Sequence, residues 1–379
     1  MKSLNFVKFY PILTSLIFIL YSWSYNNEIL YPIDDAYIYL QQAKLLSEGF
    51  FLQYSEYDTK TNACTSFIYY IIYSFFWKIV QIFDLELKKQ VEWITIINFI
   101  FNFFLLIIFI NLIKKISLEY LKKNQNIIFF ILLSTIPISY SFFSGLETGL
   151  TVTLVTIQFY SIFKKQRINF LLSSVVLSLN RPENIILNLF LIIFYIVDLF
   201  LQKKIKKEDV YIVILIFLSI LIIPIINYIN YSDIKVSGYS RVNWGLGKIF
   251  WFKALLLSIP TSIYKLLTSI YATPDYFDYK YYKYFNFIQL LVFLIFIISL
   301  ITLINNSKKK LKKLIFLKKK TKFNIIISKI TFYFKNYRFG ILATIFIIGY
   351  SCLPLTLASY GELSRYVAPI LPLLILVLF

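Results

Sequence analysis

Two adjacent carboxylates, Asp34 and Asp35, follow the first long apolar run and begin the segment Asp34-Asp35-Ala36-Tyr37-Ile38-Tyr39-Leu40. Carboxylates at a membrane face can remove a proton from a hydroxyl nucleophile, or hold a divalent cation such as Mg²⁺ or Mn²⁺ through their oxygens. The structural alternative is a helix start over 36–48, where an N-cap Asp contributes roughly 1 kcal/mol and a second acid favours the helix dipole. A cap explains one acid better than two, so we predict Asp34 and Asp35 as the catalytic pair of a helix that Gly49 ends.

The remaining residue types narrow the chemistry. The chain has no histidine, which removes the commonest general base and metal ligand. Acid–base or metal chemistry must therefore use Asp, Glu, Lys or Tyr. Cys64 and Cys352 lack the spacing of a zinc site, and we interpret them as ordinary small residues, with a disulfide left open. No P-loop, glycine-rich cradle or nucleophile elbow occurs in the sequence.

A third acid lies in the segment Ser144-Gly145-Leu146-Glu147-Thr148, between two apolar runs. The segment predicts a tight turn between helices, with glycine supplying the bend. An ordinary helical hairpin would explain it. However, Glu147 falls at the expected membrane edge, where acids are functional by default. We therefore predict Glu147 as a supporting residue of a site.

The segment Asn180-Arg181-Pro182-Glu183 interrupts a long apolar stretch. Pro182 is expected to break the helix there. Arg181 either pairs with Glu183 at the helix turn or binds an anion such as phosphate, whose shape suits a guanidinium fork.

More basic residues fall in expected outer loops, namely Arg241 and Lys248 near Trp244 and Trp251, and Arg365 near the end of the chain. Basic residues with interfacial aromatics usually anchor a protein at the membrane surface. They can equally hold a phosphate or a sugar. Because no soluble-nucleotide motif is present, a phosphate carried on a lipid is the ligand we expect.

Composition places these residues on a membrane scaffold. The chain is 59% hydrophobic and 15% charged, whereas soluble domains are about 25% charged. The apolar runs are long and continuous, which predicts an all-α polytopic membrane protein rather than a barrel. The net charge of +20 comes from lysines clustered between apolar runs. This clustering is typical of cytoplasmic loops, not of a nucleic-acid surface.

About ten transmembrane helices are expected. The segment 66–83 either crosses the membrane or lies in its interface, and the positive-inside rule favours a surface helix because most basic residues then fall in the cytoplasm. No small-residue cleavage site follows the first span, so we expect it to be retained. The predicted spans are 7–24, 92–113, 127–143, 148–163, 168–179, 184–201, 210–229, 284–306, 339–358 and 367–379.

These spans form one integral membrane domain over 1–379, without a soluble domain. We expect a long first external loop with juxtamembrane helices (25–91), a second external loop (230–283) and a basic cytoplasmic loop (307–338). The basic loop alternates lysines with apolar residues, which indicates an amphipathic helix attracted to anionic lipid. The last apolar run continues to Phe379, which leaves open a native C-terminus beyond it.

Taken in order, several motifs resemble the bacterial glycosyltransferases of the GT-C superfamily, in particular the polyprenyl-phosphate-dependent arabinofuranosyl- and mannosyltransferase-like branch. The motifs are Asp34 to Leu40, Ala43, Glu48-Gly49, Thr65-Ser66, Ser144 to Thr148, Arg181-Pro182-Glu183, and Arg365-Tyr366 with Pro369 and Pro372. The resemblance spans nearly the whole chain. It departs in two places, because Phe67 stands where relatives usually have proline and many relatives have a longer C-terminal part.

The resemblance implies a multispan fold in the bacterial cytoplasmic membrane, with its active site facing outside. The donor would be a polyprenyl-phosphate-linked sugar, and the acceptor a glycan, lipid or protein. The acid of the first outer loop, as base or as ligand of Mg²⁺ or Mn²⁺, maps onto Asp34 and Asp35. Of the other matched residues, Arg181 and Arg365 would have donor-phosphate roles, and Glu147 and Glu183 supporting or acceptor-side roles. Apart from the resemblance, we predict donor-phosphate roles for Arg241 and Lys248 of the outer loop and a supporting role for Tyr37.

The expected reaction is a single displacement that inverts the anomeric centre. A transporter or lipid-linked glycan flippase would use the same apolar spans and outer arginines. Transporters, however, tend to have repeated halves and helices broken at the midplane, and we find no internal repeat. A glycan polymerase or ligase is chemically close and also stays open.

Overall fold

The computed structural model contains only helices and connecting segments in the part of the chain that it describes. The described residues are 11–12, 15–16, 19–20, 23, 27–31, 35–57, 60, 66–120, 141–181, 183–201 and 205–231. No strand occurs within these ranges, which confirms the all-α prediction for them. The helices are α2 (Asp35–Ser47), α3 (Phe67–Gln81), α4 (Leu87–Tyr120), α7 (Thr148–Lys164), α8 (Arg167–Asn180), α9 (Glu183–Leu201) and α10 (Lys207–Tyr231).

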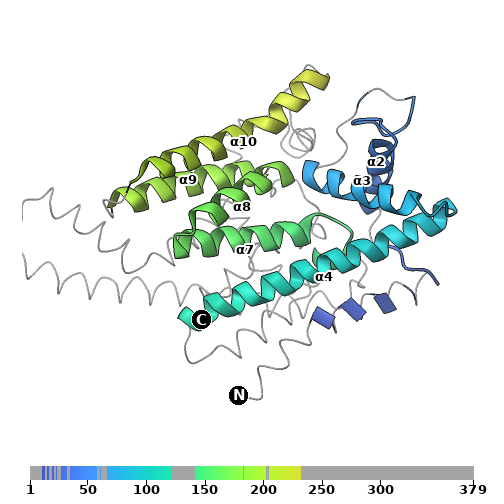
Figure 1. Ribbon diagram of the computed structural model, residues 1–379, viewed down its shortest axis with the longest axis horizontal. Helices are drawn as coiled ribbons and strands as arrows, with labels where there is room; N and C mark the ends of the chain where they lie inside the picture. Colours follow the sequence, from blue (N-terminus) through green and yellow to red (C-terminus); the bar gives the residue numbers. More distant parts are fainter. Residues whose placement is uncertain are drawn as a thin grey trace, which may run out of the picture.

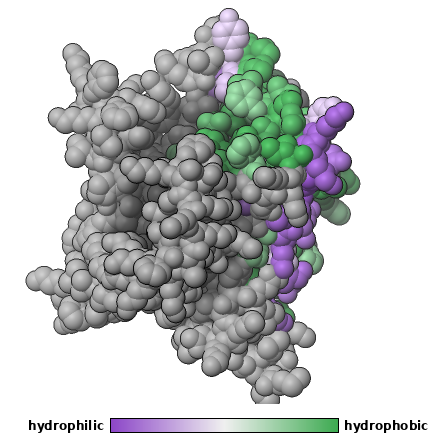
Figure 2. All heavy atoms as spheres, turned by 90° about the vertical axis from the view of Figure 1, so that its left-hand side faces the viewer, coloured by the Kyte–Doolittle hydropathy of each residue, from purple (hydrophilic) through white to green (hydrophobic). Residues whose placement is uncertain are grey.

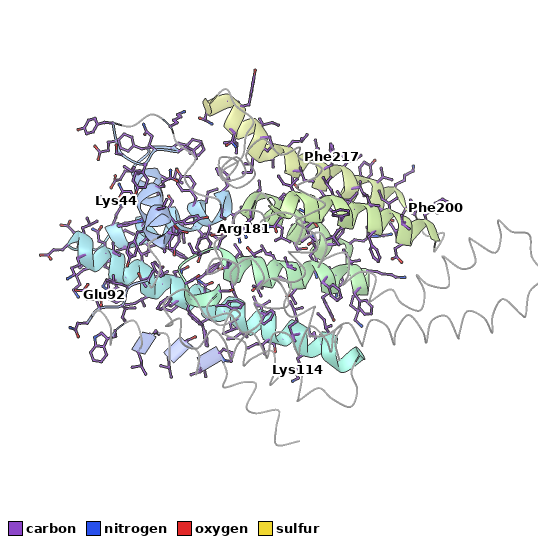
Figure 3. The ribbon with its side chains drawn as sticks, turned by 180° about the vertical axis from the view of Figure 1, so that it is seen from behind. Lys44, Glu92, Lys114, Arg181, Phe200 and Phe217 are labelled. Carbon is purple, nitrogen blue, oxygen red and sulfur yellow. The ribbon has the colours of Figure 1, made fainter. Side chains whose placement is uncertain are left out.

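Among the residues that the structure describes, two helices are long and apolar enough to cross a membrane, over Leu87–Ile116 in α4 and Lys207–Asn230 in α10. Only 44% and 28% of their most apolar windows are buried, so both keep an apolar surface for lipid or for the rest of the chain. Figure 3 shows the labelled Phe200 and Phe217 pointing away from the neighbouring helices. At the level of length and composition, this supports a membrane protein.

The helices are arranged around α7 (Figure 1). This helix packs on α4 and α8, α8 packs on α9 and α10, and α3 packs on α2 and α4. Nearly every residue of α7 from Thr148 to Ile162 is buried. The two short helices α2 and α3 lie at the end of the bundle where α7 begins and α8 ends (Figure 1).

Threonines make this central position possible. The hydroxyls of Thr151, Thr153 and Thr156 donate to the carbonyl oxygens of Glu147, Gly149 and Val152, at 3.0, 3.0 and 2.8 Å. Because each of these hydroxyls donates to the preceding turn of its own helix, the three threonines can be buried without a partner on another helix for their protons.

A buried hydrogen-bond network joins α7 to the three helices that follow it. The amide of Gln158 donates to Ser174 Oγ at 2.7 Å and to Asn188 Oδ1 at 2.6 Å. The amide of Asn188 donates to Ser178 Oγ at 2.7 Å, and Ser219 Oγ lies 3.2 Å from Ser178 Oγ. Small polar side chains of this kind hold apolar helices together where the hydrophobic effect between them is weak.

The helix bounds follow the sequence predictions closely for α2 and for α7 to α10. Gly49 ends the α2 segment with φ +101°, as expected. The expected break at Pro182 is confirmed, because α8 ends at Asn180 and α9 begins at Glu183. The predicted span 92–113 lies inside the longer α4, which also includes polar residues at both ends.

Segment 66–83 forms α3, which packs on α2 and α4; its placement in the membrane interface stays a prediction. The predicted spans 284–306, 339–358 and 367–379, the cytoplasmic loop 307–338 and nearly all of the loop 230–283 lie outside the described residues. The ten-span topology therefore stays a prediction as well.

Candidate functional site

Four motifs that are distant in the sequence meet at one end of the bundle. They are the start of α2, the residue before α3, the turn before α7 and the end of α8. Three sets of contacts bring them together. Two of them join a pair of motifs each, and the third is a chain of hydrogen bonds that runs through several.

The first contact is between Gly145 and the start of α2. Gly145 has φ +83°, and a Cβ atom added there would lie 2.9 Å from Ala36 Cβ and 2.5 Å from Tyr31 Cδ1. Its carbonyl oxygen accepts a hydrogen bond from Tyr73 Oη at 2.7 Å. Glycine is therefore required both by the backbone conformation and by the approach of α2. The sequence predicted the bend but not this approach.

Asp35 is the first residue of α2 and directly precedes the fully buried Ala36. The Gly145 contact thus places the predicted catalytic segment beside the turn that carries Glu147. Asp35 is half-buried, and its neighbour Asp34 lies outside the described residues.

Tyr37, one residue beyond Ala36, is 37% exposed, and its hydroxyl donates to the Tyr31 carbonyl oxygen at 3.4 Å. Burial raises the pKa of the Tyr37 phenol; the hydrogen bond to Tyr31 opposes this and the charge of Glu28 adds to it. A neutral phenol near the site is a hydrogen-bond donor rather than a base.

The second contact is a buried ion pair. Arg181 Nε lies 3.2 Å from Glu147 Oε1, and the two side chains are 3% and 4% exposed. Arg181 follows the last residue of α8, and Glu147 precedes the first residue of α7. Burying a charge costs several kcal/mol unless a partner offsets it, so the pair joins these two helix ends. Figure 3 shows Arg181 in the interior, between the helices.

This pairing bears on the alternatives for Arg181. Its described ion-pair partner is Glu147, which lies 34 residues earlier in the chain. The side chain of Glu183, the partner considered from the sequence, lies outside the described residues. A phosphate that approached Arg181 would meet a guanidinium already paired with a carboxylate.

The third contact is a chain of side-chain hydrogen bonds from α7 to α2. Asn180 Nδ2 donates to Thr151 Oγ1 at 2.7 Å, and Ser66 Oγ donates to Asn180 Oδ1 at 2.7 Å. The backbone amide of Ser66 donates to Tyr39 Oη at 2.8 Å. Ser66 also caps α3 by accepting from the Tyr69 amide at 3.0 Å.

The sequence motifs include Ser66 and Asn180 but do not indicate that the two residues interact, and they assign no role to Tyr73. The sequence features that mark Ser66 and Asn180 are local. Ser66 stands directly before an apolar run, as an N-cap residue does, and Asn180 interrupts another. Neither signal identifies the partner.

A metal ion at this site would need several donor atoms. Within the described residues, no group of three or more His, Cys, Asp or Glu side chains could hold a metal ion. Asp35 is the described half of the predicted pair, and carboxylate oxygens are donors that Mg²⁺ and Mn²⁺ prefer. A cation would therefore need Asp34 and oxygens of the substrate or solvent as well. Arg241, Lys248 and Arg365 lie outside the described residues.

No protein-family model matches the chain, and neither does any curated protein or solved structure.

Proposed function

We propose that the chain is a membrane glycosyltransferase that moves a sugar from a polyprenyl-phosphate donor to a hydroxyl of a glycan, lipid or protein acceptor outside the bacterial cytoplasmic membrane. The observation that supports this most is the meeting of separate motifs. The start of α2, which carries Asp35, packs through Ala36 on the Gly145 turn, and that turn leads into the buried Glu147–Arg181 pair.

In the proposed step, the carboxylate of Asp34 or Asp35 takes the proton of the acceptor hydroxyl. The hydroxyl oxygen attacks the anomeric carbon, and the bond from that carbon to the phosphate oxygen breaks with its electron pair. The polyprenyl phosphate leaves as a stable anion, so no general acid is needed. A single displacement inverts the anomeric centre.

The basic residues have two proposed tasks. Arg181, Arg241, Lys248 and Arg365 balance the charge that develops on the donor phosphate. Since Arg181 is already paired with Glu147, its first task is to hold the Gly145 turn in place beside α2. Most of the charge balance at the phosphate therefore falls to Arg241, Lys248 and Arg365.

The proposed supporting residues are Glu147, Glu183 and Tyr37. The neutral phenol of Tyr37 can donate a hydrogen bond to an oxygen of the acceptor or of the sugar when its hydroxyl turns away from the Tyr31 carbonyl oxygen, to which it donates at 3.4 Å. Asp34 and Asp35 are also the residues that would hold a divalent cation.

The test is deletion of the gene, profiling of cell-surface glycans by mass spectrometry, and complementation with wild type, Asp34→Asn, Asp35→Asn and Asp84→Asn. Asp84 is an exposed residue between α3 and α4 with φ +46°, a conformation that Asn also tolerates. It is the matched control for the same chemical change outside the site.

We expect a sugar residue to be missing in the deletion strain and restored by wild type and Asp84→Asn only. If the Asp34→Asn strain and the Asp35→Asn strain each had wild-type glycans, the catalytic assignment would be refuted. An unchanged sugar composition, with lipid-linked intermediates accumulating on the cytoplasmic side, would favour a flippase instead.

A further inference from the structure

A pocket of about 650 Å³ lies between α8 and α10, at the end of the bundle opposite the Glu147–Arg181 pair. It opens where both helices begin, beside Arg167 of α8 and Glu208 of α10. Its volume falls within the range of about 300–1,000 Å³ that is typical of ligand pockets. The proposed transferase chemistry does not use it.

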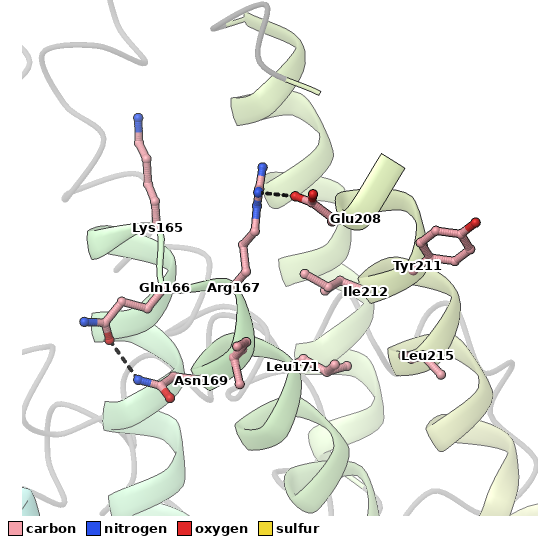
Figure 4. A pocket seen from close by; sticks show the side chains of 10 residues that line it. Lys165, Gln166, Arg167, Asn169, Leu171, Glu208, Tyr211, Ile212 and Leu215 are labelled. Atoms are coloured by element: carbon pink, nitrogen blue, oxygen red, sulfur yellow. Dashed lines mark hydrogen bonds and ion pairs between the residues drawn. The ribbon is translucent and has the colours of Figure 1, made fainter. Parts of the chain in front are cut away.

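The pocket changes from polar to apolar along the helix axes. Lys165, Arg167 and Glu208 surround its mouth, whereas Leu171, Ile212 and Leu215 line the deeper part (Figure 4). The apolar residues follow the polar ones at helical spacing, so each helix contributes one continuous stripe. This gradient matches a molecule with a polar head and an apolar chain lying parallel to the helices.

Part of the charge at the mouth is fixed within the protein. Arg167 lies 2.6 Å from Glu208 Oε2 and 2.7 Å from Asp209 Oδ1. Tyr195 Oη donates to the same Asp209 oxygen at 2.6 Å, and the Lys206 amide donates to the other oxygen at 2.9 Å. These contacts hold α8, α9 and α10 together, and Arg167 offsets one of the two acidic charges.

Other basic residues leave this end positive. Lys164 and Lys165 end the α7 segment, Lys206 and Lys207 begin the α10 segment, and all four are exposed. Figure 2 views the molecule toward this end and shows hydrophilic side chains next to hydrophobic ones among the described residues. The wall residues Ile168 and Tyr211 are 72% and 64% exposed, as expected for side chains that face lipid near a membrane surface.

We propose that this pocket binds an anionic phospholipid. The phosphate lies at the mouth near Lys165, and one acyl chain lies along Leu171, Ile212 and Leu215. Basic pockets between membrane helices bind anionic head groups through this combination of charge and apolar surface. The proposal needs the chain to be a membrane protein but does not depend on its being a glycosyltransferase.

The test is a titration of the full-length protein with phosphatidylglycerol or phosphatidylcholine, followed by native mass spectrometry. Lys165→Gln removes one positive charge at the mouth, and Lys78→Gln, at an exposed lysine on α3, is its matched control. Leu215→Trp fills the deeper part, and Leu218→Trp, which lies on the same helix, is 52% exposed and does not line the pocket, is the second control.

We expect wild type to retain phosphatidylglycerol in preference to phosphatidylcholine. Lys165→Gln should lower the phosphatidylglycerol affinity by about fivefold, and Leu215→Trp should remove retention, while both controls behave as wild type. Equal retention of the two lipids, or equal effects of a variant and its control, would overturn the proposal. The proposal would also be overturned if inorganic phosphate displaced phosphatidylglycerol as effectively as added lipid does, because the ligand would then be a free anion.

Discussion

Arg181 Nε and Glu147 Oε1 lie 3.2 Å apart in a buried layer of the bundle, although the two residues belong to separate turns of the chain. The pair joins the end of α8 to the start of α7. Through Gly145, the same turn contacts the beginning of α2, where Asp35 lies. The ion pair is therefore part of the framework that positions the proposed catalytic carboxylates.

Loss of one member of this pair should destabilise the protein strongly. Glu147→Gln or Arg181→Gln would leave a buried charge without its partner, at a cost of about 3–5 kcal/mol. The double variant should cost less than the sum of the two single variants. Unfolding of the purified protein in detergent measures these differences.

The control for the ion pair is Lys44→Gln, since Lys44 and Glu48 are 3.7 Å apart and their side chains are 30% exposed. Exposed pairs contribute at most about 1 kcal/mol. Additive effects of Glu147→Gln and Arg181→Gln would contradict the coupling.

Gly145→Ala should disrupt the site more than Gly49→Ala does. Both glycines have positive φ, +83° and +101°, so both substitutions carry a backbone strain of roughly 1–2 kcal/mol. At Gly49 nothing lies within 4 Å of an added Cβ, whereas at Gly145 the atoms of Tyr31 and Ala36 would have to move.

Unfolding measurements and complementation of the glycan phenotype test this comparison. We expect Gly49→Ala to keep transfer and Gly145→Ala to lose it. Equal losses in the two variants would mean that strain alone, without the contact to α2, explains the requirement for glycine.

Asn188→Leu should loosen the attachment of α9 to α7 and α8. Asn188 accepts from Gln158 and donates to Ser178 Oγ and to the Ser174 carbonyl oxygen. Its loss leaves buried polar groups unsatisfied, at a cost of about 1–3 kcal/mol. Asn169→Leu, at an exposed position with one hydrogen bond to Gln166, should change the unfolding free energy by less than about 0.5 kcal/mol.

Tyr37 should remain neutral throughout the working pH range. Its pKa is raised from 10.0, so any stability linked to the neutral phenol is fully present below pH 10 and is lost only as the pH rises through the folded pKa. Tyr37→Phe should therefore lower the transfer rate without changing the shape of the pH–rate profile below pH 10. A limb of the profile that disappears in Tyr37→Phe would show that the phenol ionises during the reaction.

The sequence predicted local features well because local chemistry determines them. The bounds of α2 follow from the Asp pair and Gly49, and the break after α8 follows from Pro182. The extent of α4 was underestimated, because apolar residues mark the part that suits a membrane, whereas a helix can continue through polar residues such as Lys88 and Lys115.

Long-range contacts were not predictable in the same way. Ser66 and Asn180 are 114 residues apart, and a single sequence contains no signal that relates them. Hydropathy also does not distinguish a helix that protein surrounds on all sides from a helix that faces lipid. The local feature of α7 that indicates its central position is its series of threonines, whose hydroxyls donate to carbonyl oxygens of the preceding turn.

The length of α4 sets a scale of depth for the whole bundle. Its 34 residues extend about 51 Å, more than the roughly 30 Å of hydrocarbon in a bilayer. If the apolar part between Trp93 and Lys114 fills that layer, Asn102 lies about 14 Å below the Trp93 side. Gly149 packs on Asn102, so the start of α7 would lie at a similar depth, below the membrane edge that the sequence predicts for Glu147. A substrate dissolved in the bilayer would then reach this layer by lateral diffusion, without first passing through the aqueous phase.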